Sequence, residues 1–245
     1  MKNSLKGWLK SGDSAFARVT FSLLTAILHF DLPVIRPVHG LLYPLHKLLT
    51  RILGATLRVF YWTPLFKSQL RNTPKNLLIY TGMPLLLGHL AITMGDNCRV
   101  SGQSTISGRT SSATTPELIV GDNVGISWQN EIFVGNRVKI GNNVHMGVKV
   151  RLVGYPGHPV EPEARAKGLP ETDDQVGDIT LGDDVWLAAG VTVLGGVTIG
   201  AGTIVATGSV VTKDLPARVL AAGIPAKVVK QLDFTSKTDG EPDHG

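Results

Sequence analysis

The sequence of 245 residues contains a single cysteine, Cys98. One thiol excludes an internal disulfide framework and fits a reducing compartment. The simplest interpretation of Cys98 is a small residue buried in a hydrophobic core. The chain is long enough to build such a core without covalent cross-links.

The sequence also lacks a hydrophobic run long enough to span a membrane. A spanning helix needs roughly 18 to 20 apolar residues, whereas the best candidate, Val19 to Phe30, has twelve residues between Arg18 and Asp31. No secretory cleavage pattern follows it. Charged residues make up only 18% of the chain, and glycine occurs 28 times. This composition suits a solenoid with many tight corners better than a helical bundle.

What the sequence does have is a repeat of six residues. Near the C-terminus an aliphatic residue recurs at every sixth position, at Leu181, Leu187, Val193, Ile199, Val205 and Val211. The same spacing, with breaks that indicate insertions, continues upstream through Met94, Val100, Ile106, Val120, Ile126, Val134, Ile140, Met146 and Leu152. Neither a helix nor an alternating antiparallel strand has this period. It is typical of a parallel β-helix, in which glycine takes the corner conformations that need positive φ. A glycine or another small residue often follows the aliphatic one, as Gly141 and Gly200 do.

Charge is distributed unevenly along the chain. Residues 1–75 contain eleven Lys and Arg against two acidic residues, whereas residues 76–245 contain thirteen against seventeen. From Leu41 to Lys67, apolar residues at helical spacing are interleaved with cations. Such a stretch can lie on an anionic membrane surface, or it can cap the open end of a β-helix. The pattern is less suited to nucleic acid, because the cations do not gather on a polar face with exposed aromatics.

Three regions are predicted. Residues 1–75 form a basic amphipathic extension of two or three helices, which we expect to associate with membrane and to have boundaries near Pro33, Pro37, Pro44 and Pro64. Residues 76–232 form the β-helix domain, with the repeat itself starting near Ala91, and residues 233–245 form a mobile polar tail. The longest interruption, residues 154–178, is expected to be a functional loop.

Several motifs in and after this loop occur in a characteristic order. Gly157-His158-Pro159 is followed by Glu161, Glu163 and Arg165, and then by the segments 179–187, 196–200, 208–216 and 222–229. Together they resemble the hexapeptide-repeat acyltransferases, in particular the sugar O-acetyltransferases related to maltose, galactoside and colanic-acid acetyltransferases. The resemblance covers roughly residues 91–230. It implies a mainly β fold, a left-handed parallel β-helix. The N-terminal α-helical extension lies outside the part of the chain that the resemblance explains. The resemblance also implies a homotrimer with active sites between subunits, acetyl-CoA as co-substrate, and no metal.

The resemblance also implies roles for individual residues. His158 matches the general base, which would accept the proton of an attacking hydroxyl. Candidate acceptor-binding residues are Asn130, His145, Glu161 and Glu163, of which His145 could equally be structural. Candidate acetyl-CoA-binding residues are Trp186, Ala188, Ala189, Thr207, Thr212, Lys213, Lys227 and Lys230. A backbone amide near Ala188 or Ala189 would stabilise the oxyanion.

The sequence therefore predicts an acetyl-CoA-dependent O-acetyltransferase that modifies a sugar hydroxyl of a surface polysaccharide or a lipid-linked glycan precursor. We expect it at the cytoplasmic face of the inner membrane. The alternatives are transfer to a soluble acceptor, such as serine, a free sugar or an amino sugar, and a non-catalytic β-helix scaffold. A zinc-dependent carbonic anhydrase is disfavoured, because His89, His145 and His158 do not have the spacing of a ligand set.

Overall fold

The computed structural model describes residues 14–233. Contacts divide the chain into two compact units, Met1–Arg51 and Ile52–Gly245. Apart from Asp233, the predicted polar tail of residues 233–245 lies outside the described residues.

The N-terminal part is helical, as the sequence predicts. Its elements are α2 (Ala15–Leu28), α3 (Arg36–Leu57), the π-helical turn η1 (Arg58–Trp62) and α4 (Thr63–Lys67). The predicted boundary at Pro44 is wrong, because α3 continues through this residue. Pro44 cannot donate to the carbonyl of Gly40, and on this exposed helix water can replace the missing bond. Among the described residues, no helix combines the length and hydrophobicity needed to cross a bilayer.

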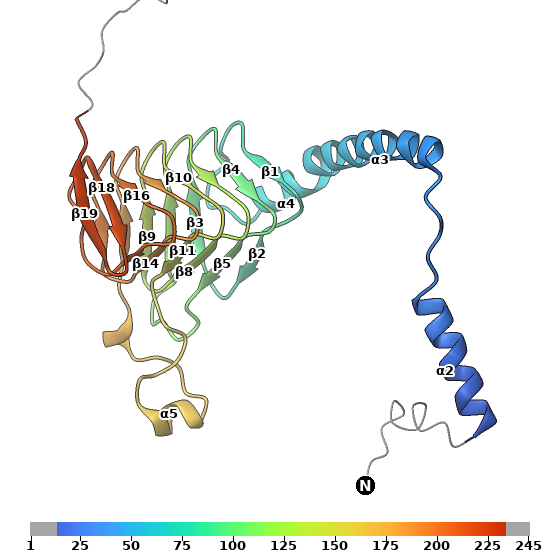
Figure 1. The fold of residues 1–245 in the computed structure, drawn as a ribbon. Coiled ribbons are helices and arrows are strands. Elements are labelled where there is room, and N and C mark those ends of the chain that lie inside the picture. The colour runs from blue at the N-terminus through green and yellow to red at the C-terminus, as the bar shows by residue number, and fades with distance from the viewer. Residues whose placement is uncertain (1–13, 234–245) are drawn as a thin grey trace, which may run out of the picture. The chain divides into compact units, whose positions relative to one another are not determined.

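The rest of the chain winds through three sheets, which we name A, B and C (Figure 1). Sheet A consists of β3 (Ala91–Met94), β6 (Glu117–Val120), β9 (Arg137–Ile140), β12 (Ile179–Leu181) and β15 (Thr198–Ile199). Sheet B consists of β1 (Leu78–Tyr80), β4 (Arg99–Ser101), β7 (Gly125–Ile126), β10 (His145–Met146), β13 (Trp186–Leu187), β16 (Ile204–Val205), β18 (Val219–Gly223) and β19 (Ala226–Gln231). Sheet C consists of β2 (Leu85–Leu87), β5 (Thr105–Gly108), β8 (Glu131–Val134), β11 (Arg151–Val153), β14 (Thr192–Leu194) and β17 (Val210–Val211).

Successive strands visit the three sheets in turn, and their neighbours pair in parallel except for β18 with β19. The molecule therefore has three edges, AB, BC and CA, where the chain turns from one sheet to the next. The predicted parallel β-helix is confirmed. Its first parallel strand begins at Leu78, before the predicted start near Ala91, because the spacing of six is not kept from Ile79 to Met94.

The repeated aliphatic residues form the core. Every one of them is at most 3% exposed, and they stack in columns such as Ile140, Leu181 and Ile199 in sheet A. One break in the spacing of six lies elsewhere than the sequence predicts, because Leu152 pairs with Ile132 and not with the repeat residue Val134. The two extra residues of this coil follow Val134 at the CA edge.

The prediction that glycines at the corners adopt positive φ is confirmed at some corners and wrong at others. Gly190, Gly202 and Gly208 have the predicted positive φ at corners of the later coils, whereas Gly141 and Gly200 do not. At the AB edge that conformation belongs mostly to polar residues: Asn97, Asn123, Asn143 and Asp184, with φ of 55–60°. Asn and Asp tolerate this conformation better than other side chains. Gly141 is needed for a different reason, since a Cβ there would lie 2.7 Å from the backbone nitrogen of Asp183 in the next coil.

Replacing Gly141 by alanine is therefore expected to destabilise the β-helix by about 1–3 kcal/mol, because backbone must move apart in two coils. Thermal unfolding followed by circular dichroism measures the effect. Gly54→Ala is the matched control, because a Cβ at Gly54 meets no atom within 4 Å. An unchanged unfolding midpoint for Gly141→Ala would show that the coils separate without cost.

The first coil is closed by the last part of the helical region. Phe66 in α4 is fully buried in the same cluster as Ile79 and Ile92, and Leu70 forms a parallel bridge with Ile92. The cap that the sequence offered as an alternative is therefore present, but residues near 62–70 supply it. Most of the large apolar side chains of α2 and α3 remain exposed.

Candidate functional site

The predicted functional loop leaves the CA edge between β11 and β12, as Figure 1 shows. It contains two short helices, α5 (Pro162–Ala166) and the 3-10 turn η2 (Asp173–Gln175). At its base Gly154 donates to the carbonyl of Phe133 at 2.8 Å, and Gly177 donates to the carbonyl of Gly154 at 3.0 Å. These bonds join the two ends of the loop, so its residues project from one edge of the β-helix.

His158 lies in this loop with an exposed side chain. Its backbone carbonyl accepts a hydrogen bond from Nε2 of Gln175 at 3.4 Å. Next to it, the guanidinium of Arg165 donates to the carbonyls of Pro159, at 3.1 Å, and Val160, at 2.9 Å. The backbone around His158 is thus held while the imidazole stays accessible to a substrate.

The two glutamates of the loop differ in environment. Glu161 caps α5, because its carboxylate accepts the N–H groups of Glu163, at 2.8 Å, and Ala164. Such a capping role satisfies donors at the start of the helix. Glu163 lies in the first turn with an exposed side chain. Of the two, only Glu163 has a carboxylate that the capping of α5 does not use.

A buried ion pair fastens the far part of the loop to an earlier coil. Nε of Arg109 donates to Oε1 of Glu171, and Nη1 donates to Oδ1 of Asp173 at 2.6 Å. The side chains of Arg109 and Glu171 are only 4% and 5% exposed. Ser111 also donates to Glu171, at 2.7 Å.

The burial of this pair affects ionisation in a definite direction. Burial opposes the charge of Glu171, but hydrogen bonds from Ser111 and Arg109 outweigh it and hold the pKa of Glu171 below its usual value. Burial likewise opposes the charge of Arg109, and its bonds to Asp173 and Glu171 raise its pKa. Because the pKa of Glu171 is lower in the folded protein than in the unfolded chain, its ionisation stabilises the folded state at pH values above the pKa of the unfolded chain. This contribution is lost as the pH falls through the pKa of the folded protein.

A second group of predicted residues lies on sheet B. His145 in β10 and Trp186 in β13 are direct neighbours in register, and both are exposed. Beside His145 is a cavity of about 590 Å³, whose lining includes Leu78, Arg99, Ser127 and Met146. The rings of Tyr80 and Trp128, which also line it, meet edge to face at 5.6 Å. Aromatic faces beside polar side chains are suited to a ligand with both apolar and hydroxyl surfaces.

The BC edge carries three of the predicted cofactor residues, Ala188, Ala189 and Thr207, which are small and at least partly exposed. The amide of Ala188 donates to the carbonyl of Val205 at 2.9 Å, so the strand ladder already uses it. Within residues 14–233 no such bond is found for the amide of Ala189, which is therefore the better candidate for oxyanion stabilisation.

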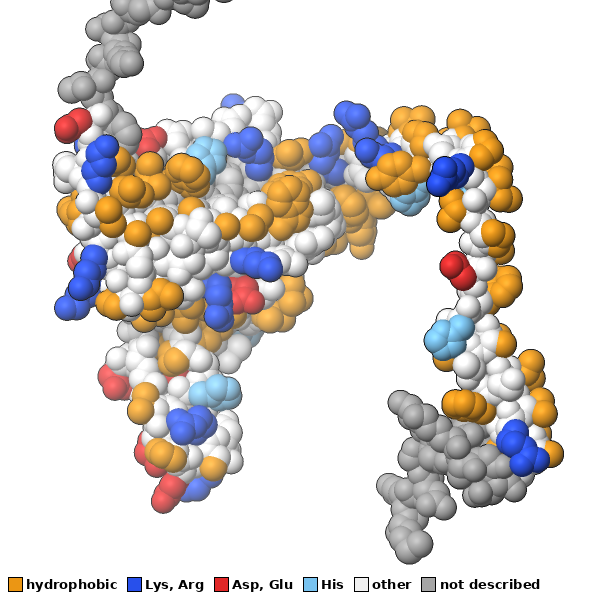
Figure 2. Space-filling view, in the orientation of Figure 1, with side chains coloured by type: hydrophobic (Ala, Val, Ile, Leu, Met, Phe, Trp, Pro, Cys, Tyr) orange, Lys and Arg blue, Asp and Glu red, His pale blue; other side chains and the backbone are white. Residues whose placement is uncertain are grey.

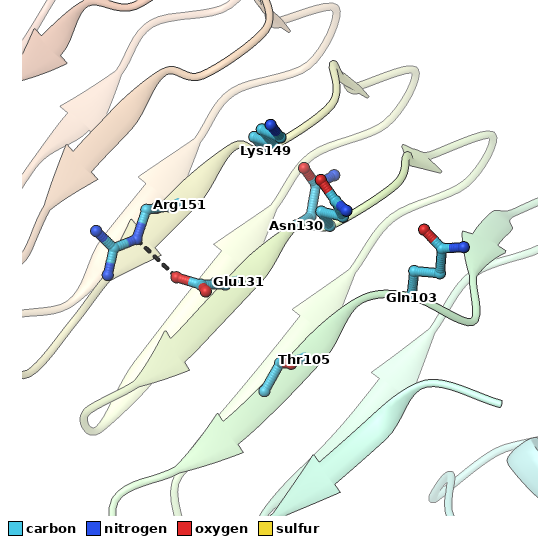
Figure 3. A pocket seen from close by; sticks show the side chains of 7 residues that line it. Gln103, Thr105, Asn130, Glu131, Lys149 and Arg151 are labelled. Atoms are coloured by element: carbon cyan, nitrogen blue, oxygen red, sulfur yellow. Dashed lines mark hydrogen bonds and ion pairs between the residues drawn. The ribbon is translucent and has the colours of Figure 1, made fainter. Parts of the chain in front are cut away.

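Asn130 lies at the same edge but is fully buried. Its Oδ1 accepts the N–H of Val150 in the next coil at 2.8 Å, while Nδ2 is the one buried side-chain polar atom of the described residues without a partner. Figure 3 shows Asn130 beside a polar cavity of about 600 Å³, where Arg151 and Glu131 form an ion pair at 2.7 Å. The position of Asn130 suits a structural role between coils.

The remaining predicted residues lie on the last coils. Thr212 and Lys213 follow β17 at the CA edge, the edge that carries the loop of His158. Lys227 and Lys230 lie on β19, the final strand of sheet B. All four are exposed.

The predicted residues therefore form two groups on different sides of the protein. His158, Thr212 and Lys213 belong to the CA edge, whereas His145, Trp186 and the alanines belong to sheet B and its BC edge. In a three-sided coil the CA edge is opposite sheet B. A single protomer consequently does not bring the loop histidine to the residues on sheet B.

Two features of the site were not recognised in the sequence. Arg109 lies 62 residues before Glu171 and 64 residues before Asp173, and no local sequence pattern pairs it with either of them. Tyr80 and Trp128 are brought together by coil stacking, and their aromatic character was the only available signal. Within residues 14–233, no three His, Cys, Asp or Glu side chains are grouped so that they could hold a metal ion.

Comparisons with known proteins agree with this architecture. Residues 178–213 match the family model described as bacterial transferase hexapeptide (six repeats). The galactoside O-acetyltransferase of Escherichia coli (strain K12) is 32% identical over 100 residues, which are 41% of this chain and 47% of that protein. The galactoside O-acetyltransferase of Lactococcus lactis is 32% identical over 116 residues, which are 47% and 49% of the two chains. The chain thus spans about half the length of these relatives.

A solved structure extends the comparison to the fold. AntD, an N-acyltransferase from Bacillus cereus solved with dTDP and 3-hydroxybutyryl-CoA, aligns with a TM-score of 0.52 and 17% identity over 69% of this chain and 87% of its own. The fold and the repeats define a left-handed β-helix of the hexapeptide class. The chain resembles the hexapeptide-repeat acyltransferases in sequence and in fold, and among them the galactoside O-acetyltransferases, so the predicted resemblance is confirmed.

Proposed function

We propose that the protein is an acetyl-CoA-dependent O-acetyltransferase that modifies a sugar hydroxyl of a surface polysaccharide or of its lipid-linked precursor. The observation that carries this proposal is the exposed His158, on a loop fastened at its base and again by a buried ion pair. The similarity to galactoside O-acetyltransferases supports a sugar acceptor and an acetyl donor.

The proposed reaction begins when His158 takes the proton of the acceptor hydroxyl. The oxygen attacks the thioester carbon of acetyl-CoA, and the negative charge that develops on the carbonyl oxygen is stabilised by the amide of Ala189. Collapse of this intermediate breaks the carbon–sulfur bond and forms the acetyl ester. The departing thiolate recovers the proton from His158, so the histidine returns to its initial state.

We propose a homotrimer with three active sites, each between neighbouring subunits. The distribution of the candidate residues supports this assembly, because the CA edge and sheet B cannot contribute to one site within a protomer. One subunit would supply His158 and Lys213, and its neighbour would supply Trp186 and Ala189. Lys213, Lys227 and Lys230 would attract the phosphates of acetyl-CoA as mobile point charges.

The N-terminal helices support attachment to an anionic membrane at its cytoplasmic face, where a lipid-linked acceptor would be found. Eight apolar residues of α3 follow helical spacing along one side, and each is 46–72% exposed: Val38, Leu41, Leu42, Leu45, Leu48, Leu49, Ile52 and Leu53. In Figure 2 the helices are covered with hydrophobic side chains that have Lys and Arg among them. Residues 14–67 contain six Lys and Arg against one acid, Asp31. This composition matches a lipid surface that carries negative charge.

The direct test is acetyl transfer by the purified full-length protein. The protein is incubated with acetyl-CoA and either a galactoside, an amino sugar or a glycolipid fraction, and release of the CoA thiol is followed. An O-acetyl product is expected, and mild base will remove its acetyl group. A base-stable product would instead favour transfer to an amine, as in AntD. Failure to bind CoA at all would favour a non-catalytic scaffold.

A further inference from the structure

The loop that carries His158 is tied to the β-helix by a cluster that the stacking of coils does not require. Arg109 follows β5 at the CA edge, in an earlier coil than the loop, and its backbone N–H donates to the carbonyl of Val134 at 3.0 Å. Its guanidinium holds the carboxylate of Glu171, the carboxylate of Asp173 and, through Nη2 at 3.1 Å, the backbone carbonyl of Glu171. One side chain therefore fixes two side chains and the main chain of the loop.

The chemistry of this cluster indicates a role in geometry rather than in stability. A buried ion pair loses much of its attraction to desolvation, so it contributes little net stability but defines one arrangement of its partners. The planar guanidinium of Arg109 strengthens this effect, because its donors have fixed directions. We call this guanidinium, which binds Glu171 and Asp173, the Arg109 fork. The β-helix core contains aliphatic columns that need no such pair.

The cluster is connected to His158 through the next residues of the loop. Asp173 is the first residue of η2, which ends at Gln175. Thr172 and Gln175 form a capping box, in which the side-chain oxygen of Gln175 accepts the backbone N–H of Thr172. This bond fixes the side-chain amide of Gln175. That amide donates to the carbonyl of His158 at 3.4 Å. Only η2 separates the Arg109 fork from the backbone of His158.

We propose that Arg109 is a positioning residue whose fork, acting through Glu171, Asp173 and Gln175, holds His158 where the acceptor hydroxyl is deprotonated. The inference rests on the proposed acetyl transfer. Loss of the fork leaves the imidazole chemically intact but lets the loop move. The turnover number falls, whereas the KM for acetyl-CoA, which the later coils bind, changes little.

The test compares Arg109→Gln with Arg71→Gln, which removes an exposed arginine that pairs with Glu117. For Arg109→Gln we expect a 10- to 100-fold lower kcat, a KM for acetyl-CoA within about twofold of wild type, and faster tryptic cleavage after Lys167. Gln175→Ala removes the contact to His158 together with the bonds that the Gln175 side chain accepts from Thr172, and it avoids an unpaired buried charge. It should lower kcat several-fold with unchanged thermal unfolding.

The outcomes separate this inference from the proposed function. If the wild-type protein transfers no acetyl group, the proposed function fails. Faster tryptic cleavage of Arg109→Gln would still support the conclusion that the contacts of Arg109 hold the loop in place. If the wild type is active and both Arg109→Gln and Gln175→Ala behave like Arg71→Gln in kcat and in cleavage, the positioning role is overturned.

Discussion

Replacing His158 by alanine is expected to lower the turnover number of acetyl transfer by about 10²- to 10⁴-fold, the usual contribution of a positioned general base. The KM for acetyl-CoA should change little, because the variant loses proton transfer rather than a contact to the cofactor. Steady-state release of the CoA thiol, measured with the acceptor saturating, gives both quantities.

The effect can be assigned to chemistry because His158 carries little of the fold. Its side chain is exposed, and the one hydrogen bond found here among the described residues is to its backbone carbonyl, which alanine retains. The free energy of unfolding of the variant should therefore stay within about 0.5 kcal/mol of the wild-type value, as for most surface substitutions.

His89→Ala is the matched control. His89 is also an exposed histidine at the CA edge, in the turn between β2 and β3, and it lies outside the loop. It should retain full activity. Wild-type turnover in the His158 variant would refute the assignment of the base, and equal losses in both variants would point to a general effect of removing imidazoles from this edge.

The repeat predicts the β-helix well because one rule governs every coil. An aliphatic side chain at each sixth position has to point inward, and Leu181, Leu187 and Val193 accordingly lie on three successive sheets. The rule says less about corners, where more than one residue type satisfies the backbone. Asn143 adopts the positive φ at the AB edge, and Gly141 is selected by the close approach of the next coil.

The candidate site was predictable only in part. The motif around His158 identifies the loop, but the sequence does not show that Glu161 caps α5 or that the amide of Ala188 is used by the ladder. The Arg109 fork joins segments more than 60 residues apart, and such contacts follow from three-dimensional stacking rather than from local pattern. The helix boundary predicted at Pro44 is wrong for a different reason, because the cost of a proline in a helix depends on whether water can reach the backbone there.

The N-terminal helices provide the other large expected effect. The full-length protein should sediment with vesicles that contain an anionic lipid and much less with vesicles of neutral lipid. The cations of α3 at Arg36, Lys47 and Arg51 lie on the side away from its apolar residues. Each cation near an anionic surface contributes about 1 kcal/mol, and this attraction is screened as salt is raised. Binding should therefore weaken several-fold as ionic strength rises.

The apolar face is tested by a double variant, Leu45→Asp with Ile52→Asp, which places two carboxylates in the middle of that face. We expect vesicle binding to fall more than about tenfold, because charged groups now have to enter the acyl boundary. The matched control adds the same two charges to the β-helix, at Ile224→Asp and Val229→Asp, where both side chains are exposed. The control should bind vesicles as the wild type does.

A second outcome would assign the same face to protein rather than lipid. If α3 packs against a second copy of the chain, the wild type will form concentration-dependent assemblies without lipid. The double variant Leu45→Asp with Ile52→Asp will then remain dissociated at the same concentrations. Equal binding to neutral and anionic vesicles would remove the role of the cations. Anionic selectivity together with loss of binding in the double variant is expected only if α3 lies on the membrane, because that contact alone requires both its charge and its apolar face.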